Sequence, residues 1–196
     1  ILHVKKYAAL YFGEFDSFVS IILEVSKTAK VRASGYISQA PTFFQIAFAT
    51  TIVLKRSQSF SPSERKRIKQ MGKQCRKLLE TAVKKGNPNA VHSLAILNAE
   101  RAALNAHAIT KQHKRHRAFR AAVKMYQAAI RIAARGGLIQ DQALANERLG
   151  EHMLIETNFP NARETAKYHF GEAIRLYGEW RADGKVDQLQ HRYKAI

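Results

Sequence analysis

The feature that most constrains the fold is a helical face near the C-terminus. Its apolar residues are Ala166, Phe170, Ala173, Tyr177 and Trp180, which recur at intervals of four, three, four and three. That spacing places them on one side of an α-helix, with charged residues on the other. Small residues on such a face let two helix backbones approach, and the rings fill the space between them. The segment therefore predicts one arm of a tightly packed helical hairpin.

The same face recurs upstream. Ala122–Ala129 has the pattern Ala-x3-Tyr-x2-Ala, and Ala166–Ala173 has Ala-x3-Phe-x2-Ala, 44 residues later. A weaker copy, Cys75–Ala82, precedes the middle one by 47 residues. Hairpins repeated at this period must stack on their neighbours to bury their apolar faces, which is typical of an α-solenoid.

The pattern predicts an all-α chain that forms one helical-repeat domain. Only four prolines and ten glycines occur in 196 residues, and a composition of this kind favours helix. The predicted hairpins cover residues 1–33, 41–86, 88–136 and 141–181, with a closing helix at 186–193.

Local signals predict several helix ends. Ser61 through Glu64 reads Ser-Pro-Ser-Glu, which combines a capping box with a proline at the first helical position. Gly86 is expected to end that helix. Gly13 is expected to stop an earlier one, and Asp16 to cap the helix that follows it.

Three further segments carry structural predictions. The helix after Asp16 should bury a stripe that runs from Phe18 to Val25. The segment Thr42–Leu54 is apolar nearly all round, so it should be central with neighbours on several sides. Thr110–His116 should be a polar loop or a frayed helix end, with helix again from Arg117 to Arg135.

The last two units resemble the tetratricopeptide repeat. The matching residues are Leu149, Gly150, Met153, Ala166, Phe170 and Ala173. Two departures stand out: the spacing from Gly150 to Ala166 is four residues longer than usual, and the closing proline is missing. The resemblance therefore implies an α-solenoid of tetratricopeptide-like hairpins with lengthened arms.

A longer resemblance covers nearly the whole chain. Gln142–Leu154 and Ala166–Tyr193 look like the helical region of very large signalling ATPases, and so do Leu2–Phe18, Pro41–Arg56 and Lys85–Leu104. In that family a Ser/Thr-kinase-like or cyclase domain and an AAA-type ATPase module precede these helices, and GAF and histidine-kinase domains often follow. The resemblance implies a non-catalytic module for protein or interdomain contact, whose partners are other domains of a larger signalling protein or a separate protein.

One departure from that family concerns a helix end. The family usually has Trp-Gly-Ala where this chain has Trp180-Arg181-Ala182. Because arginine adopts a left-handed conformation less readily than glycine, a straighter or longer helix is expected here.

The net charge of +18 is concentrated in two segments. Lys55–Lys85 has eleven bases against two acids, and Arg101–Arg135 has nine bases and no acid. Basic fields attract nucleic acid or acidic partners, although solvated outer helix faces have the same composition. The alternative function is therefore a basic, nucleic-acid-binding α-solenoid. Its candidate contact surface is a groove formed by Arg65, Lys66, Lys69, Lys73, Arg76, Lys77, Lys114, Arg115, Arg117 and Arg120.

No sequence motif for catalysis, phosphate binding or metal binding occurs in the chain. Cys75 lies on an apolar stripe, which favours a small core residue over a nucleophile. His113 and His116 lack neighbouring acids or thiols and have basic neighbours that would repel a cation. His152 and His169 are expected to face each other as packed residues of the last hairpin. No catalytic residue, cofactor or metal is predicted, and an enzyme would need a deep pocket lined with convergent polar groups.

The expected setting is the cytoplasm. The chain has no secretory signal, a single cysteine and no apolar run long enough to span a bilayer. It starts at Ile1 without a methionine, which indicates a fragment of a larger protein or a trimmed chain.

Overall fold

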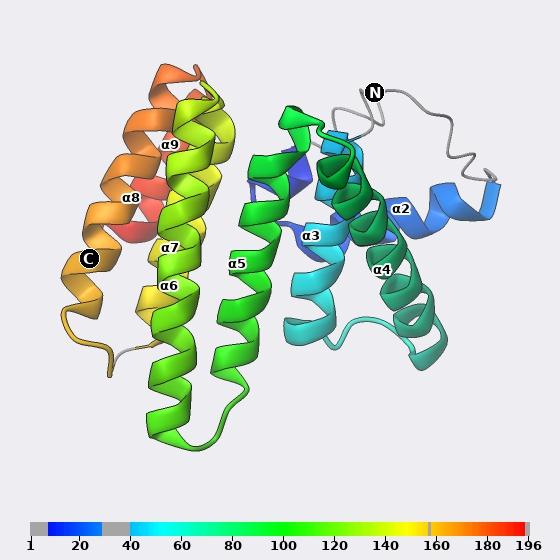
Figure 1. Cartoon of the computed structure of the whole chain (residues 1–196), viewed down its shortest axis with the longest axis horizontal. Coiled ribbons are helices and arrows are strands. Elements are labelled where there is room, and N and C mark those ends of the chain that lie inside the picture. Colours follow the sequence, from blue (N-terminus) through cyan, green and yellow to red (C-terminus); the bar gives the residue numbers. More distant parts are fainter. Residues whose placement is uncertain (1–7, 29–39, 157, 195–196) are drawn as a thin grey trace. The chain divides into compact units, whose positions relative to one another are not determined.

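The computed structural model describes residues 8–28, 40–156 and 158–194, and it describes no side chain in 25–28. Every regular element in these ranges is a helix and none is a strand, which confirms the all-α class (Figure 1). Residues 1–7 and 29–33 of the first predicted hairpin, and the side chain of Val25, lie outside the described residues. None of the helices described has both the length and the apolar character needed to cross a membrane.

The chain divides into two compact units, residues 1–97 and 98–196. The division falls inside helix α5 (Val91–His107), which belongs to the third predicted hairpin. Each unit has a buried apolar core of its own. The α-solenoid of stacked, repeated hairpins stays a prediction.

Unit 1 is built around one buried helix. Its elements are α2 (Phe15–Thr28), α3 (Ala40–Arg56), α4 (Pro62–Lys84) and the short 3-10 helix η2 (Pro88–Ala90). Helix α3 packs against both α2 and α4. Its residues Phe44, Phe48 and Ile52 are at most 3% exposed, and Gln45 and Thr50 are buried too. The predicted central position of Thr42–Leu54 is confirmed.

Helix α4 begins and ends as its sequence predicts. The backbone N–H of Glu64 donates to the Ser61 hydroxyl, and the Glu64 carboxylate accepts from the Ser61 backbone N–H at 2.9 Å. This closes the capping box around Pro62. The chain leaves the helix through Gly86, whose φ of 80° lies in the left-handed region.

The predicted cap at Asp16 is wrong. Helix α2 already begins at Phe15, so Asp16 lies in its first turn. Its Oδ2 accepts hydrogen bonds from the hydroxyls of Ser57 and Ser59, at 2.8 and 3.0 Å. The Asp16 carboxylate, predicted to cap the start of the helix, instead accepts hydrogen bonds from residues distant in the sequence. Gly13 does end the preceding turn, with a φ of 78°.

Unit 2 is organised around helix α7. Its elements are the C-terminal part of α5, then α6 (Gln112–Arg135), α7 (Ile139–Ile155), α8 (Ala162–Glu179) and α9 (Asp183–Tyr193). Helix α7 packs against α6 and α8, and α8 also packs against α9. Every residue from Ala143 to Met153 is buried. Polar side chains on α7 must therefore find partners within the protein.

The repeated apolar face is buried where the sequence predicts it. In Ala122–Ala129 and Ala166–Ala173, the two alanines and the ring of each pattern are at most 2% exposed. In the weaker copy, Leu79 is fully buried, whereas Cys75 and Ala82 are half-buried. Trp180, at the end of the C-terminal face, is also only half-buried.

The segment Thr110–His116, predicted as a polar loop or a frayed helix end, is largely helix. Helix α6 begins at Gln112, five residues before the predicted start at Arg117. The segment contains no glycine or proline, and Arg115 is anchored by an ion pair to Glu156. Because no residue in this charged run breaks a helix, the run forms the first turn of α6.

Gly150 lets α7 and α8 approach closely. A Cβ atom at this position would lie 2.8 to 3.0 Å from three ring carbons of Phe170. The ring is itself buried and stacked on Tyr193, with centroids 3.7 Å apart, so it has little room to move.

We expect Gly150→Ala to destabilise unit 2 by about 1–2 kcal/mol. Alanine normally stabilises a helix by about 0.5–1 kcal/mol relative to glycine, but overpacking costs about 1–3 kcal/mol and should dominate here. Urea unfolding followed by the fluorescence of Trp180, the only tryptophan, would measure the change. Gly171→Ala on α8 is the matched control, because no atom lies within 4 Å of its Cβ position. That control should gain stability, and a gain at Gly150 would contradict the close approach.

The expected longer helix at Trp180-Arg181-Ala182 is wrong. Helix α8 ends at Glu179, and Arg181 takes the left-handed conformation with a φ of 61°. The N–H of Ala182 donates to the carbonyl of Tyr177 at 2.9 Å, and that of Arg181 to the carbonyl of Gly178 at 3.0 Å. These two bonds form a Schellman motif, which satisfies carbonyls at the helix end. The turn also starts α9, whose Lys185 must reach Glu147.

Arg181→Gly should stabilise unit 2 by about 0.5–1 kcal/mol. A non-glycine residue in the left-handed region costs about 1–2 kcal/mol, and part of the gain is offset by the greater chain entropy of unfolded glycine. The midpoint of urea unfolding would report the change. The opposite kind of change, Gly137→Ala after α6, should destabilise the protein, because Gly137 has a φ of 65°. If Arg181→Gly were destabilising, the left-handed cap would be refuted.

Candidate functional site

The predicted basic contact residues of unit 1 all lie on α4. Lys66, Lys69, Lys73 and Lys77 are exposed at intervals of three, four and four, so they follow one side of the helix. The two arginines near them have structural partners. Arg65 donates to the backbone carbonyls of Leu54 and Ser57, both at 2.7 Å, and Arg76 pairs with Glu80 at 2.6 Å.

The predicted contact residues of unit 2 lie on α6. Lys114, Arg117 and Arg120 are exposed. Arg115 is half-buried and pairs with Glu156 at 2.8 Å, so its charge is used within the unit. Because the α4 and α6 residues belong to different units, their convergence on one groove stays a prediction.

The other reactive side chains named from the sequence show no catalytic arrangement. Burial raises the pKa of the Cys75 thiol to about 11, so the thiol is protonated at neutral pH and is a weak nucleophile. His113 is exposed, and the ring of His116 packs edge-on against Phe159, with centroids 6.2 Å apart. Among the described residues, no group of three or more His, Cys, Asp or Glu side chains could hold a metal ion.

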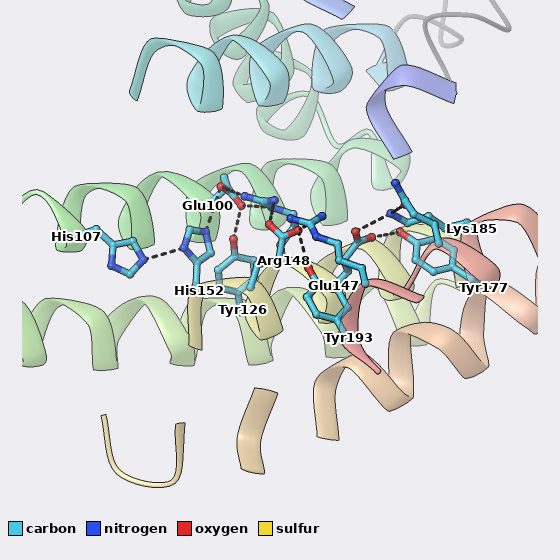
Figure 2. A network of polar contacts seen from close by, with 12 residues as sticks. Glu100, His107, Tyr126, Glu147, Arg148, His152, Tyr177, Lys185 and Tyr193 are labelled. Carbon is cyan, nitrogen blue, oxygen red and sulfur yellow. Dashed lines mark hydrogen bonds and ion pairs between the residues drawn. The ribbon is translucent and has the colours of Figure 1, made fainter. Parts of the chain in front are cut away.

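A buried polar network centred on Glu100 joins three helices of unit 2 (Figure 2). The carboxylate of Glu100, on α5, accepts hydrogen bonds from Nη2 and Nε of Arg148, on α7, at 2.8 and 3.0 Å. It also accepts from the hydroxyl of Tyr126, on α6, at 2.5 Å, and lies 3.2 Å from Nε2 of His152. All four residues are at most 3% exposed. Sequence reasoning did not find this cluster.

Two histidines extend the network to a second carboxylate. Nδ1 of His152 lies 2.9 Å from Nε2 of His107, and Nδ1 of His107 lies 3.2 Å from Glu156. Nε2 of His152 and Nδ1 of His107 each face a carboxylate, and the other two ring nitrogens share one hydrogen bond. These three contacts need three ring protons. Two neutral imidazoles supply only two. The pair therefore satisfies every contact when it carries one positive charge between Glu100 and Glu156.

A second part of the network reaches α9. Arg148 also pairs with Glu151, one turn further along α7. The hydroxyl of Tyr193 donates to Glu151 at 3.1 Å, and Arg192 lies 3.2 Å from the same carboxylate. The end of α9 is thereby attached to α7 by both charge and hydrogen bonding.

Glu147 forms a separate buried cluster with α8 and α9. Its carboxylate accepts from Nζ of Lys185 at 2.7 Å and from the hydroxyl of Tyr177 at 2.9 Å. Nζ of Lys185 also donates to the side chain of Gln188 at 2.8 Å. Burial raises the pKa of Glu147, and the nearby Lys185 opposes that change.

The electrostatics keep the central pair charged. Burial alone raises the pKa of Glu100, but the charges of Arg148 and His152 outweigh it and hold that pKa well below its ordinary value. Burial lowers the pKa of Arg148, but Glu100 and Glu151 more than compensate and raise it well above normal. Breaking a buried pair of this kind leaves a charge without compensation, which is strongly destabilising.

The network is closed to substrates. Glu100, Tyr126 and His152 are fully buried, so their polar groups hold helices together and cannot meet a molecule from solution. One signal in the sequence could have indicated it. Glu100 is the only acidic residue between Thr81 and Gln140, and it stands in an alanine-rich segment that packs closely. A lone carboxylate on such a face must find a buried cation.

His152 and His169 do not form the expected pair. His152 contacts Glu100 and His107, whereas Nδ1 of His169 donates to Oδ1 of Asn146 at 2.8 Å. Burial lowers the pKa of His169 to about 4, so its imidazole is neutral at pH 7. The two histidines project from different helices toward different neighbours, which their one-dimensional spacing could not reveal.

An open groove of about 720 Å³ is one accessible feature of unit 2. It is lined by residues of α6, α7 and α8, including Arg131, Gln142 and Tyr168, and it reaches the buried pair Asn146 and His169. Its lining mixes amide, hydroxyl, charged and aromatic groups. Such a surface offers hydrogen bonds and a stacking face, and contains no arrangement of nucleophile and base.

Comparison with known proteins adds no relative. No protein-family model matches the chain, and neither a curated protein nor a solved structure matches it.

Proposed function

We propose that the chain is a non-catalytic α-solenoid of tetratricopeptide-like hairpins that makes protein–protein or interdomain contacts. Support comes from helices that pack in sequence order, α3 with α4 and α7 with α8. The repeated small–aromatic–small face, buried in both α6 and α8, is the packing that such hairpins use.

The observation that carries the proposal is where the polar side chains of α7 point. Glu147, Arg148, Glu151 and His152 are at most 9% exposed and form buried bonds to neighbouring helices. A helix bundle tied in this way resists deformation and transmits displacement between its surfaces. This suits a module that positions other domains.

The larger setting is a multidomain signalling protein of the cytoplasm. This part of the proposal rests on the resemblance of Gln142–Leu154 and Ala166–Tyr193 to the helical region of large signalling ATPases. The module would lie between an ATPase module and an output domain and relay conformational change between them.

Crosslinking mass spectrometry of the full polypeptide encoded by the surrounding reading frame tests this function. Crosslinks from lysines of this chain to an ATPase module and to an output domain are the expected result. A reading frame without such domains would contradict the signalling setting. Full-length protein without crosslinks from this chain to any other domain would contradict the contact function.

A second candidate function is nucleic-acid binding through α4. The observation that favours it is the row of exposed lysines at positions 66, 69, 73 and 77, which have no ion-pair partner among the described residues. Such a row can contact successive phosphates along a backbone.

If α4 binds duplex nucleic acid, the logarithm of the association constant should fall linearly with the logarithm of the salt concentration. Changing these four lysines to glutamine should reduce the slope by roughly 3 to 4, since each phosphate contact contributes about 0.9. Fluorescence anisotropy with a labelled duplex would measure both slopes. Lys167→Gln, an exposed lysine of α8, serves as the control. A slope that is unchanged in the α4 variant would reject this function.

A further inference from the structure

We propose that the groove lined by α6, α7 and α8 binds an extended peptide of a partner protein, and that this peptide carries an acidic and a basic side chain on opposite sides of its backbone. The inference deepens the proposed contact function and rests on it.

The floor of the groove is a fixed polar pair. Asn146 and His169 are at most 7% exposed and are joined by a hydrogen bond of 2.8 Å. The Asn146 amide also donates to the backbone carbonyl of Gln142 at 2.9 Å. Two apolar residues would fill the same space without the cost of burying polar groups. Unlike the closed network around Glu100, this polar pair lines an accessible groove, so its remaining polar atoms can serve recognition.

The pair presents one defined acceptor. The carbonyl of Asn146 can only accept, so Nδ1 of His169 carries the proton of that bond. In the neutral ring the other nitrogen, Nε2, is then an acceptor. Because His169 lines the groove and its ring stays neutral at pH 7, this nitrogen suits a backbone N–H of a bound chain.

Side chains around the floor can bind more of a peptide backbone. Gln142, Thr165 and Tyr168 line the groove, and their polar side-chain atoms form no hydrogen bond within the described residues. They offer both donors and acceptors. Tyr168 is 64% exposed, an unusual state for an aromatic ring on a helix that is otherwise well packed. Tyrosines at such positions contribute strongly to binding between proteins.

The two rims of the groove carry opposite charges. Arg131 of α6 and Glu164 of α8 both line it, and neither has an ion-pair partner among the described residues. Glu172 adds a further carboxylate on α8, although Arg175 already pairs with it at 2.9 Å. Successive side chains of an extended peptide point to opposite sides. An acidic side chain can therefore face α6 while a basic one, an odd number of positions away, faces α8.

The size and openness of the groove favour a peptide over a small molecule. Its volume of about 720 Å³ lies within the range of ligand sites, but exposed residues form its rims and polar groups are spread along its length. A small ligand would leave many of these groups without partners. A peptide backbone supplies a donor and an acceptor at every residue.

Selection from a phage-displayed library of random dodecapeptides tests the inference, with the purified protein as target. The selected peptides should contain an acidic and a basic residue separated by an odd number of positions. Fluorescence anisotropy with synthetic copies should show about tenfold weaker binding to Arg131→Glu and to Glu164→Arg. Both residues are exposed, so the variants should fold. Lys167→Glu, an exposed change outside the groove, should alter binding less than about twofold.

Charge reversal in the peptide decides the orientation. Replacing the peptide's acidic residue with lysine should restore binding to Arg131→Glu, and replacing its basic residue with glutamate should restore binding to Glu164→Arg. The inference is overturned if no peptide is selected, or if the selected peptides bind both variants as tightly as they bind the original protein. It is also overturned if neither charge change in the peptide restores binding to the corresponding variant.

The outcome can be separated from that of the proposed function. Crosslinks to other domains that persist in the Arg131→Glu, Glu164→Arg double variant would exclude the groove as the contact site while the contact function stands. Full-length protein that forms no interdomain crosslink, even with an intact groove, would instead refute the function.

Discussion

Replacing Glu100 with glutamine should lower the free energy of unfolding of unit 2 by about 3–5 kcal/mol. The substitution keeps the shape but removes the charge that compensates Arg148 and turns an acceptor into a donor that faces guanidinium N–H groups. Glu151 remains as the other partner of Arg148. Urea unfolding followed by Trp180 fluorescence would measure the loss in unit 2, where that residue lies.

The control for Glu100 is an ion pair near the surface. Glu172 and Arg175 on α8 are half-buried and exposed, respectively, and lie 2.9 Å apart. Glu172→Gln should cost less than about 1 kcal/mol, because solvent screens such pairs. If Glu100→Gln cost no more than this control, the buried carboxylate would not be the counter-charge of Arg148.

The Glu100 carboxylate should also make the stability of unit 2 depend on pH. The pKa of Glu100 in the folded protein lies well below the ordinary 4.5, so the unfolded chain takes up the proton first as the pH falls. The contribution is complete above the unfolded pKa and is lost as the pH falls through the folded pKa. The stability difference between wild type and Glu100→Gln should therefore shrink below about pH 4.5. A difference that stays constant in that window would contradict an ionised Glu100.

Phe170→Ala should destabilise unit 2 by about 3–5 kcal/mol. The ring is 2% exposed and lies in a cluster with Leu149 and Met153, stacked on Tyr193. Its removal leaves a cavity against α7, whose own bonds prevent it from collapsing into the space. Trp180 fluorescence during urea unfolding would measure the effect, and Tyr168→Ala on the exposed side of α8 should change stability by less than about 0.5 kcal/mol.

A double variant checks the geometry behind this result. In the Phe170→Ala background, Gly150→Ala no longer meets a ring and should be neutral or stabilising by up to about 1 kcal/mol. If Gly150→Ala costs the same with and without the ring, the two residues are not in contact. A loss below about 1 kcal/mol for Phe170→Ala alone would mean that this face of α8 is exposed.

The sequence predicts those parts of the fold that depend on neighbouring residues. The capping box at Ser61 and the helix end at Gly86 require only residues a few positions apart, and both are confirmed. The burial of Phe170 follows from periodicity along one helix, and it is confirmed as well. Local stereochemistry decides the cap and the helix end, and the period of the apolar residues decides which face of α8 is available for burial.

Features that depend on distant partners could not be predicted in the same way. Glu100 and Arg148 are 48 residues apart, and nothing in either segment names the other. Asp16 has the residue type of a helix cap, but serines more than 40 positions away bind it instead. Arg181 is left-handed because two hydrogen bonds and the path to α9 outweigh its intrinsic preference. Only at Asp16 does a tertiary contact override a local rule, whereas the Glu100–Arg148 pair has no local rule that could predict it.

The buried partners of α7 also bear on the order in which unit 2 can fold during synthesis. Glu147 is neutralised by Lys185, which leaves the ribosome 38 residues later, and Glu151 binds Tyr193, 42 residues later. Until α9 has emerged, Glu147 has the hydroxyl of Tyr177 but not yet the ammonium group of Lys185, and Glu151 has Arg148 of its own helix. The charge compensation of α7 is therefore complete only after α9 has been made, so the final turn of α9 completes the nascent unit.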